Sequence, residues 1–208
     1  MGEKTALIFG SMHYADWSSL TSLRGAAVFC ADGGLHCAIE AGFSPDYYIG
    51  DGDSGGSPPS GVPAKVLPVR KDLTDLQAAW EQAYTLGFRR IVLTGCTGGR
   101  QDHHIAALQL LETISRRGCE GRLLDPDNEV AFCPPGHYTL EQGGFRFFSL
   151  LPVEAQLTAT IRHALYSLEA GVIRRGDSLG VSNAFLDGPV ELFLTGGGCW
   201  LVRSGRIE

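Results

Sequence analysis

The sequence predicts an α/β protein in which a parallel-sheet domain is followed by an antiparallel β domain. Over residues 1–125, short apolar runs alternate with helix-period segments, as in a sheet whose strands are joined by helices. From about Glu120 the pattern changes to short β-rich pieces separated by glycine and proline turns. A chain of 208 residues is long enough for two such domains.

The first domain, which we place at residues 1–125, contains eight segments in the order strand, strand, helix, strand, strand, helix, strand and helix. This order is typical of a parallel, Rossmann-like sheet. The segments are "TALIFG", "AAVFCADGG", "LHCAIEAG", "DYYIGD", "AKVLPV", "LTDLQAAWEQAYTLG", "RRIVLTG" and "DHHIAALQLLETISRRG".

Two of these helices have clear periodicity, because their apolar residues recur at intervals of three and four. Each is followed by a glycine, Gly87 or Gly118, which is a common helix end. The apolar faces are Leu73, Leu76, Trp80, Ala83 and Tyr84 in the first helix and Ala107, Leu110, Leu111 and Ile114 in the second.

The second domain, residues 126–208, begins where the period changes near "LLDPDNEV". Its runs "FRFFSLLPV", "AQLTATI" and "VELFLT" are separated by "CPPG", "EQGG", "LDGP" and "TGGG". Such spacing indicates an antiparallel sandwich or partial barrel, and we expect the β-sandwich.

Composition excludes several classes of protein. The net charge of −6, without a long basic run, argues against nucleic-acid binding. No apolar run approaches the roughly 18–20 residues that span a bilayer, and the N-terminus does not resemble a signal peptide, so we expect a cytoplasmic protein without a membrane partner. The cysteines form no C-x-x-C pair and are expected to be reduced core thiols rather than zinc ligands: Cys30, Cys37, Cys96, Cys119, Cys133 and Cys199.

Short catalytic motifs in the sequence lack the context that their chemistry needs. "GDSLG" around Ser178 matches a nucleophile elbow, but the last histidine, His163, precedes it, whereas the elbow needs a later one. "GDSGG" around Ser54 resembles a serine protease segment, but it lies in an α/β domain. The G-x-G-x-x-G match in "GDGDSG" is followed by prolines rather than by a helix.

Four acidic, glycine-rich segments follow predicted strands: "ADGG", "GDGDS", "KDLTD" and "GCTGGRQD". Open parallel sheets bind ligands at the carboxyl ends of their strands, so these segments are expected to face one cleft. That many carboxylates repel one another unless a cation lies among them, and oxygen ligands with phosphate suit Mg²⁺. The carboxylates are Asp32, Asp51, Asp53, Asp72, Asp75 and Asp102.

Cationic and backbone groups in the same segments favour a phosphate ligand. Lys71 and Arg100 supply positive charge, and "GCTGGR" offers successive backbone N–H groups as an anion nest. Thr74 is placed to cap the following helix, with Asp75 in its first turn.

With these segments the chain resembles the thiamin pyrophosphokinases. The shared motifs are "ADGG", "PD" with "GD-x-DS", "KD-x-TD", "GGR-x-DH" and "SN", at residues 31–34, 45–54, 71–75, 98–103 and 182–183. The resemblance implies Mg²⁺-dependent transfer of a pyrophosphoryl group from ATP to the hydroxyl of thiamin, releasing AMP. It also implies a homodimer whose thiamin pocket lies at the subunit interface. Two departures stand out, Gly52 in place of a bulky apolar residue and Ala107 where asparagine is frequent.

The resemblance also implies residue roles. Asp51, Asp53 and Asp75 would hold Mg²⁺, with Asp72 as a ligand or a helix cap. Lys71 and Arg100 would neutralise phosphate charge. Asp102 would either orient Arg100 or act as base, and both readings stay open. The expected catalytic residues are Asp53, Lys71, Asp75, Arg100 and Asp102, and the expected nucleotide-binding residues are Asp32, Gly33, Gly34, Ser54, Thr74, Gly98, Gly99 and Arg100.

In the β domain, Ser182 and Asn183 would bind the aminopyrimidine of thiamin. Trp200 either stacks on the thiazolium or packs in the core, and we favour the core. His103 and His104 are adjacent on a helix and are expected to pack rather than share a metal. Two other functions remain open, a non-catalytic nucleotide or thiamin sensor and a Mg²⁺-dependent phosphohydrolase.

Overall fold

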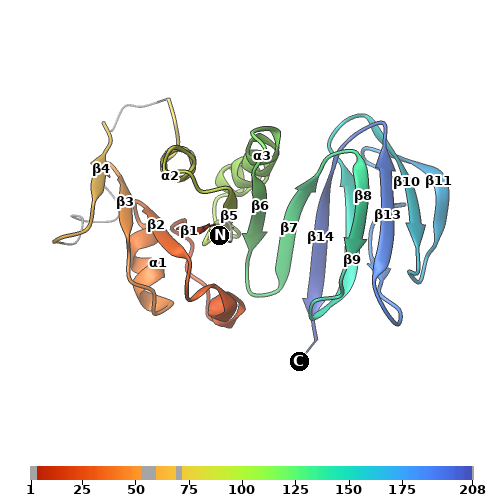
Figure 1. Cartoon of the computed structure of the whole chain (residues 1–208), viewed down its shortest axis with the longest axis horizontal. Coiled ribbons are helices and arrows are strands. Elements are labelled where there is room, and N and C mark those ends of the chain that lie inside the picture. The colour runs from red at the N-terminus through yellow and green to blue at the C-terminus, as the bar shows by residue number, and fades with distance from the viewer. Residues whose placement is uncertain (1–3, 53–59, 69–71, 208) are drawn as a thin grey trace. The chain divides into compact units, whose positions relative to one another are not determined.

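The computed structural model describes residues 4–52, 60–68 and 72–207. The chain divides into two compact units, Met1–Pro126 and Asp127–Glu208, and each has its own hydrophobic core (Figure 1). The α-helices α1, α2 and α3 belong to the first unit, whereas the described part of the second unit is built from strands.

The first unit contains a parallel sheet, which confirms the predicted sheet type. Its strands lie side by side in the order β6-β5-β1-β2-β3-β4. Their bounds are Thr5–Phe9 for β1, Ala27–Ala31 for β2, Tyr47–Gly50 for β3, Ala64–Val66 for β4, Arg90–Thr94 for β5 and Glu120–Leu124 for β6.

Helices pack on both faces of this sheet. On one face, α1 (Gly34–Glu40) contributes Leu35 and Ala38 to a core that includes Leu7 of β1. On the other face, α3 (Gln101–Arg116) packs against β6, where a Cβ atom on Gly121 would lie 2.9 Å from Ile114. A 3₁₀ helix, η1 (Ser18–Leu23), lies between β1 and β2 and was not expected from the sequence.

The two helices with clear periodicity are present. In α3 the four predicted apolar residues are buried, and Gly118 follows with φ +71°, as expected of a helix end. The helix α2 (Asp75–Thr85) begins later than its apolar pattern, because the hydroxyl of Thr74 accepts a hydrogen bond from the Gln77 N–H at 3.2 Å. The predicted cap is therefore confirmed, but the placement of Leu73 on the helix was wrong, since Leu73 precedes the cap and is 36% exposed.

The second unit consists of two antiparallel sheets, with strand orders β12-β9-β14-β7 and β11-β10-β13-β8. Both sheets contribute to one core, in which Leu150 and Leu201 of the first sheet join Leu157 and Leu192 of the second. The strand bounds are Asn128–Cys133 for β7, Gly136–Leu140 for β8, Phe145–Pro152 for β9, Gln156–Arg162 for β10, Leu168–Arg174 for β11, Asn183–Ala184 for β12, Val190–Thr195 for β13 and Cys199–Arg206 for β14.

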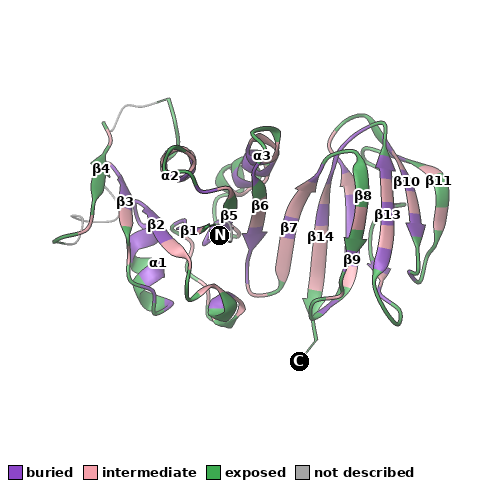
Figure 2. Cartoon of the chain, viewed as in Figure 1, coloured by how far each residue is buried: buried purple, intermediate pink, exposed green. Residues whose placement is uncertain are grey.

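The central strands β1, β2, β3 and β5 of the first unit are buried almost throughout, whereas β10 and β13 of the second unit alternate between buried and partly buried residues (Figure 2). All six cysteines are buried, which confirms that they belong to the cores. Within the described ranges, no helix combines the length and apolar character needed to cross a membrane.

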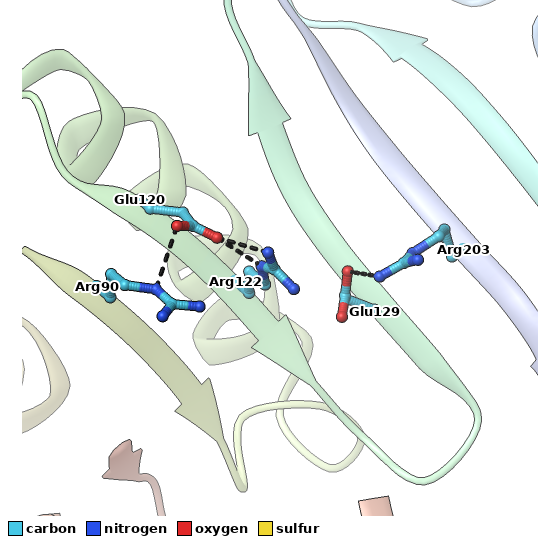
Figure 3. Close-up of polar contacts among 5 residues, drawn as sticks. All are labelled: Arg90, Glu120, Arg122, Glu129 and Arg203. Atoms are coloured by element: carbon cyan, nitrogen blue, oxygen red, sulfur yellow. Dashed lines mark hydrogen bonds and ion pairs between the residues drawn. The ribbon is translucent and has the colours of Figure 1, made fainter. Parts of the chain in front are cut away.

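Two groups of ion pairs differ in their burial (Figure 3). On β5 and β6, Glu120 lies between Arg90 at 3.3 Å and Arg122 at 2.6 Å, and all three side chains are at least 40% exposed. In the second unit, Arg203 pairs with Glu129, and both side chains are only 13% exposed. Arg203 also donates to the Glu141 carbonyl at 3.0 Å, so this pair is fixed within the fold.

Candidate active site

The order of the parallel strands reverses direction between β1 and β5. From β1 the sheet continues to β2, β3 and β4 on one side and to β5 and β6 on the other. Ligands of open α/β sheets bind at such a reversal, beyond the carboxyl ends of the strands. The loops after β1, β2, β3 and β5 leave from the carboxyl ends of these parallel strands, so "ADGG", the described start of "GDGDS" and "GCTGGRQD" lie at this edge of the sheet.

Glycines allow the backbones at this edge to approach closely. A Cβ atom on Gly34 would lie 2.0 Å from the Phe9 carbonyl oxygen, and one on Gly10 would lie 2.5 Å from the Gly95 carbonyl oxygen. Neither position has room for a side chain. The "ADGG" segment is therefore constrained by packing against the end of β1.

Asp32 occupies a buried and strained position directly after β2. Its backbone has φ +45°, and the residue is only 6% exposed. Its Oδ1 accepts hydrogen bonds from the Tyr48 hydroxyl at 2.8 Å and from the Gly52 N–H at 3.2 Å. Strained non-glycine residues are concentrated at functional sites, and Ser182, another predicted site residue, also has positive φ, at +59°.

The Tyr48 hydroxyl lies among three of the predicted acidic residues. Its pKa is raised, first by burial, then by its hydrogen bond to Asp32, and further by the negative charges of Asp32, Asp75 and Asp51. These carboxylates therefore lie close enough to act on one buried group. Sequence reasoning did not identify Tyr48. The strand carries two tyrosines, Tyr47 and Tyr48, and a buried tyrosine hydroxyl must find a polar partner.

Gly52, the departure from the family motif, has a structural reason. Its φ of +79° belongs to the region that favours glycine, and its N–H donates to Asp32. The predicted site residues Asp53, Ser54 and Lys71 lie outside the described residues.

The carboxylates fit a hard divalent cation by their chemistry. Asp51 and Asp75 are partly exposed carboxylates whose negative charges both raise the pKa of the Tyr48 hydroxyl, and Mg²⁺ takes one or two carboxylates and completes its shell with water and phosphate. Across residues 4–52, 60–68 and 72–207, no group of three or more His, Cys, Asp or Glu side chains is arranged to hold a metal.

The loop after β5 presents an exposed charge pair. Gly98 and Gly99 have φ of +83° and +57°, and Arg100 caps the N-terminus of α3. The Arg100 guanidinium donates twice to the Asp102 carboxylate, at 2.6 and 3.1 Å, and both side chains are exposed. Arg100 thereby lowers the pKa of Asp102 to about 2. This double hydrogen bond holds the Arg100 guanidinium against Asp102, as the orienting role of Asp102 requires.

Two N–H groups of the expected anion nest already have a partner within the chain. The Tyr14 hydroxyl accepts hydrogen bonds from the backbone N–H groups of Cys96 at 3.0 Å and Thr97 at 3.1 Å. Any anion bound to this loop must therefore use its other donors. Tyr14 also was not identified from the sequence.

The remaining residues of the first unit have identifiable positions. Asp72 and His103 are exposed, and His104 is partly buried in the first turns of α3. Asp46, part of the "PD" motif, accepts a hydrogen bond from the Val28 N–H at 2.8 Å. It lines a cavity of about 440 Å³ at the amino ends of β2 and β3, at the opposite end of these strands from Asp51.

In the second unit, Ser182 and Asn183 have different environments. The Ser182 N–H donates to the Ser149 hydroxyl at 3.0 Å. The Asn183 amide, which is 7% exposed, accepts from the Tyr166 N–H at 3.0 Å and donates to the Tyr166 carbonyl at 2.8 Å. The Asn183 side chain therefore fixes the loop that contains Tyr166. The second N–H of its amide takes no part in these two hydrogen bonds.

Trp200 lies on the same face of its sheet as Ser149. Trp200 pairs with Leu151 and Val202 pairs with Ser149, and alternate residues of a strand share a face. Trp200 is partly buried, and its indole N–H is shielded without a hydrogen-bond partner among the described residues. Because the Ser149 hydroxyl accepts the hydrogen bond from the Ser182 N–H, Ser182 is held on the same face of the sheet as Trp200.

Comparison with known proteins gives one consistent result. Residues 22–122 match the family described as thiamin pyrophosphokinase, catalytic domain. The thiamine pyrophosphokinase of Bacillus subtilis is 30% identical over 163 residues, which cover 74% of this chain and 76% of that protein. The crystal structure of the B. subtilis thiamine pyrophosphokinase has a TM-score of 0.89 at 25% identity, covering 98% of this chain and 100% of that one. That of the Geobacillus thermodenitrificans thiamin pyrophosphokinase has a TM-score of 0.84 at 26% identity, covering 97% of each.

Proposed function

The chain belongs to the thiamin pyrophosphokinase family, whose members are transferases, and we propose that it transfers the pyrophosphoryl group of ATP to thiamin. The products would be thiamin diphosphate and AMP. The observation that carries this proposal is the buried Asp32 directly after β2, whose carboxylate accepts hydrogen bonds from the Tyr48 hydroxyl and the Gly52 N–H at the carboxyl edge of the sheet. The family resemblance drawn from the motifs is confirmed.

The two units would bind different substrates. We assign nucleotide and Mg²⁺ binding to a Rossmann-like first domain, because the acidic and glycine-rich loops lie at its strand ends. We assign thiamin binding and dimerisation to the second domain, described as a β-sandwich. Several large apolar side chains are exposed near Ser182 and Asn183, which supports a homodimer interface there: Leu165, Tyr166, Leu179, Val181 and Leu186.

In this reaction the hydroxyl oxygen of thiamin attacks the β-phosphorus of ATP. The bond from that phosphorus to the oxygen bridging to the α-phosphate breaks, AMP leaves with the electron pair, and the hydroxyl proton passes to a base that we do not assign. Asp51 and Asp75, with Asp53, would hold Mg²⁺, which supplies charge neutralisation for the phosphates.

Arg100 and Lys71 would stabilise the charge that develops on the phosphates, and Asp102 would hold Arg100 in place. Asp32, Gly33, Gly34, Gly98 and Gly99 would contact the nucleotide, together with Ser54. The Thr74 hydroxyl is already engaged as a helix cap, so its contribution to ATP binding would come through the position of Asp75. We expect the enzyme to work in the cytoplasm.

One incubation tests the activity. With Mg²⁺, ATP and thiamin, the proposal predicts AMP and thiamin diphosphate in equal amounts. Release of ADP or free phosphate without a need for thiamin would instead indicate the phosphohydrolase. Binding of both ligands without turnover would indicate the sensor.

The metal assignment has its own test, a Mg²⁺ titration of activity. Asp75→Asn and Asp51→Asn keep the side-chain shape but remove a charge, so we expect the Mg²⁺ concentration for half-maximal activity to rise about tenfold or more. Asp46→Asn is the matched control, because Asp46 lies at the other end of β3 and only its acceptor oxygen is used. Equal Mg²⁺ requirements in all variants would contradict the assignment.

A further inference from the structure

Residues 10–17, which we call the strap, cross the reversal point of the sheet between β1 and β5. The Gly10 N–H donates to the Thr94 carbonyl at 2.7 Å, and the Met12 N–H donates to the Gly95 carbonyl at 2.9 Å. Met12 also covers Gly99, where a Cβ atom would lie 2.5 Å from the Met12 methyl carbon. The strap therefore lies directly on the loop that leads from β5 to Arg100.

The Tyr14 hydroxyl is the centre of this contact. Both of its lone pairs accept from backbone N–H groups, those of Cys96 at 3.0 Å and Thr97 at 3.1 Å. The Thr97 hydroxyl lies 2.8 Å away, so the phenolic hydrogen is donated to it. A hydroxyl that accepts twice and donates once has its full hydrogen-bonding capacity used, and all three bonds act on one short stretch of loop.

The rest of the strap holds Tyr14 in place. The Tyr14 ring packs on Trp17 with centroids 4.8 Å apart, and Trp17 packs on Phe9 of β1 at 5.8 Å. His13 pairs with Glu40 of α1 at 2.6 Å. Because Glu40 is the last residue of α1, the strap is tied to the C-terminal end of this helix as well as to the loop after β5.

We propose that Tyr14 is a positioning residue for the transfer reaction, in which its hydroxyl fixes the loop 95–100 so that Arg100 meets the triphosphate. This inference rests on the proposed function, since that function assigns Arg100 to phosphate. Removal of the hydroxyl leaves two N–H donors and the Thr97 hydroxyl without their partner, and the loop then loses its set position. The effect acts through Arg100 rather than on the reacting atoms.

The test is the Tyr14→Phe variant, which keeps the ring on Trp17. We expect the KM for ATP to rise about tenfold, as the loss of roughly 1–2 kcal/mol of hydrogen bonding implies, with the KM for thiamin unchanged. Tyr138→Phe is the matched control, because the Tyr138 hydroxyl also bonds to a backbone group, the Pro134 carbonyl at 2.6 Å, but in the second unit. The control is expected to leave both constants unchanged.

Direct binding of Mg²⁺-ATP, measured by calorimetry, separates this inference from the proposed function. If the wild type binds Mg²⁺-ATP but forms no thiamin diphosphate, the transferase proposal fails, and a tenfold loss of ATP affinity in Tyr14→Phe still supports the role of Tyr14. If the wild type does not bind Mg²⁺-ATP, both proposals fail.

A second pair of variants covers the case in which Tyr14→Phe does not fold. Thr97→Ser keeps the hydroxyl that meets Tyr14 and is expected to retain ATP affinity, whereas Thr97→Val removes it and is expected to weaken ATP binding several-fold. Unchanged or tighter ATP binding in Tyr14→Phe and Thr97→Val, or an equal rise in the KM of ATP and thiamin, would overturn the inference.

Discussion

The loops after β2 and β5 carry charged residues at the same edge of the sheet, yet they hold them in opposite ways. Asp32, after β2, is 6% exposed and bonded to Tyr48 and Gly52. Arg100 and Asp102, after β5, bond to each other with side chains 72% and 64% exposed. The loop after β2 is held by the packing of its buried residues. The loop after β5 is held by hydrogen bonds of its backbone, and its charged side chains lie in solvent.

This difference shows how stability and chemistry are divided at the site. Where polar groups are buried, a substitution disturbs the fold as well as the site, because desolvated partners lose their bonds. Where the charges are exposed, solvent replaces the lost partner and the fold tolerates the change. Substitutions in the two loops should therefore separate the loss of folding from the loss of activity.

The largest expected effect is that of Gly34→Ala in the packed loop. The new Cβ atom would lie 2.0 Å from the Phe9 carbonyl oxygen, so the strand and α1 must move apart. We expect a loss of about 3 kcal/mol or more of unfolding free energy in urea denaturation. Gly25→Ala is the control, because no atom lies within 4 Å of its Cβ position. Equal stability of the two variants would show that the loop after β2 is not tightly packed.

The ion pairs of Figure 3 extend the contrast between buried and exposed charges beyond the site. Arg203→Met removes a largely buried ion pair with Glu129, and we expect a cost of about 3 kcal/mol. Arg90→Met removes an exposed partner of Glu120 and is expected to cost about 0–1 kcal/mol. Both values come from denaturation curves, and a larger loss for Arg90→Met would contradict the role of burial.

A smaller effect on folding, but a clear one on activity, is expected for Arg100→Gln. The guanidinium is exposed and pairs with the nearby Asp102 on the surface, so the thermal midpoint should change little. Turnover with ATP and thiamin should fall about 100-fold, since a cation that stabilises phosphate charge is lost. A variant with full activity would remove Arg100 from the reaction.

The smallest expected change is the titration of Asp102. Arg100 lowers the pKa of this carboxyl to about 2, so its charge stabilises the folded state above the ordinary carboxyl pKa of about 4 and this contribution is lost as the pH falls toward 2. In Arg100→Gln the pKa should return toward about 4, as measured by carbon NMR of the side chain. An unchanged pKa would show that Arg100 does not hold Asp102.

The sequence predicted the regular part of the fold because periodicity is a local property. The four apolar positions of α3 are buried as expected, whereas Leu73 lies outside α2 because the cap at Thr74 determines where the helix begins. The 3₁₀ helix η1 has no apolar period of its own and was missed.

The site was predicted less completely, because two of its tyrosines, Tyr14 and Tyr48, contact residues that lie far from them in the sequence. Tyr48 reaches Asp32 across 16 positions and Tyr14 reaches Thr97 across 83, and neither has a local motif. Motif reasoning found the loops because glycine and acid recur within a few residues. The amide of Asn183, committed to Tyr166, likewise depends on a contact that no short pattern shows.

The central claim is that the loops after β1, β2, β3 and β5 form one triphosphate site at the reversal of the sheet. A crystal structure with Mg²⁺ and a non-hydrolysable ATP analogue tests it most directly. We predict phosphate density beside Gly99 and Arg100, with a metal ion against Asp51 and Asp75. Density for the analogue at the amino ends of β2 and β3, beside Asp46, with no ion at those carboxylates, would contradict it.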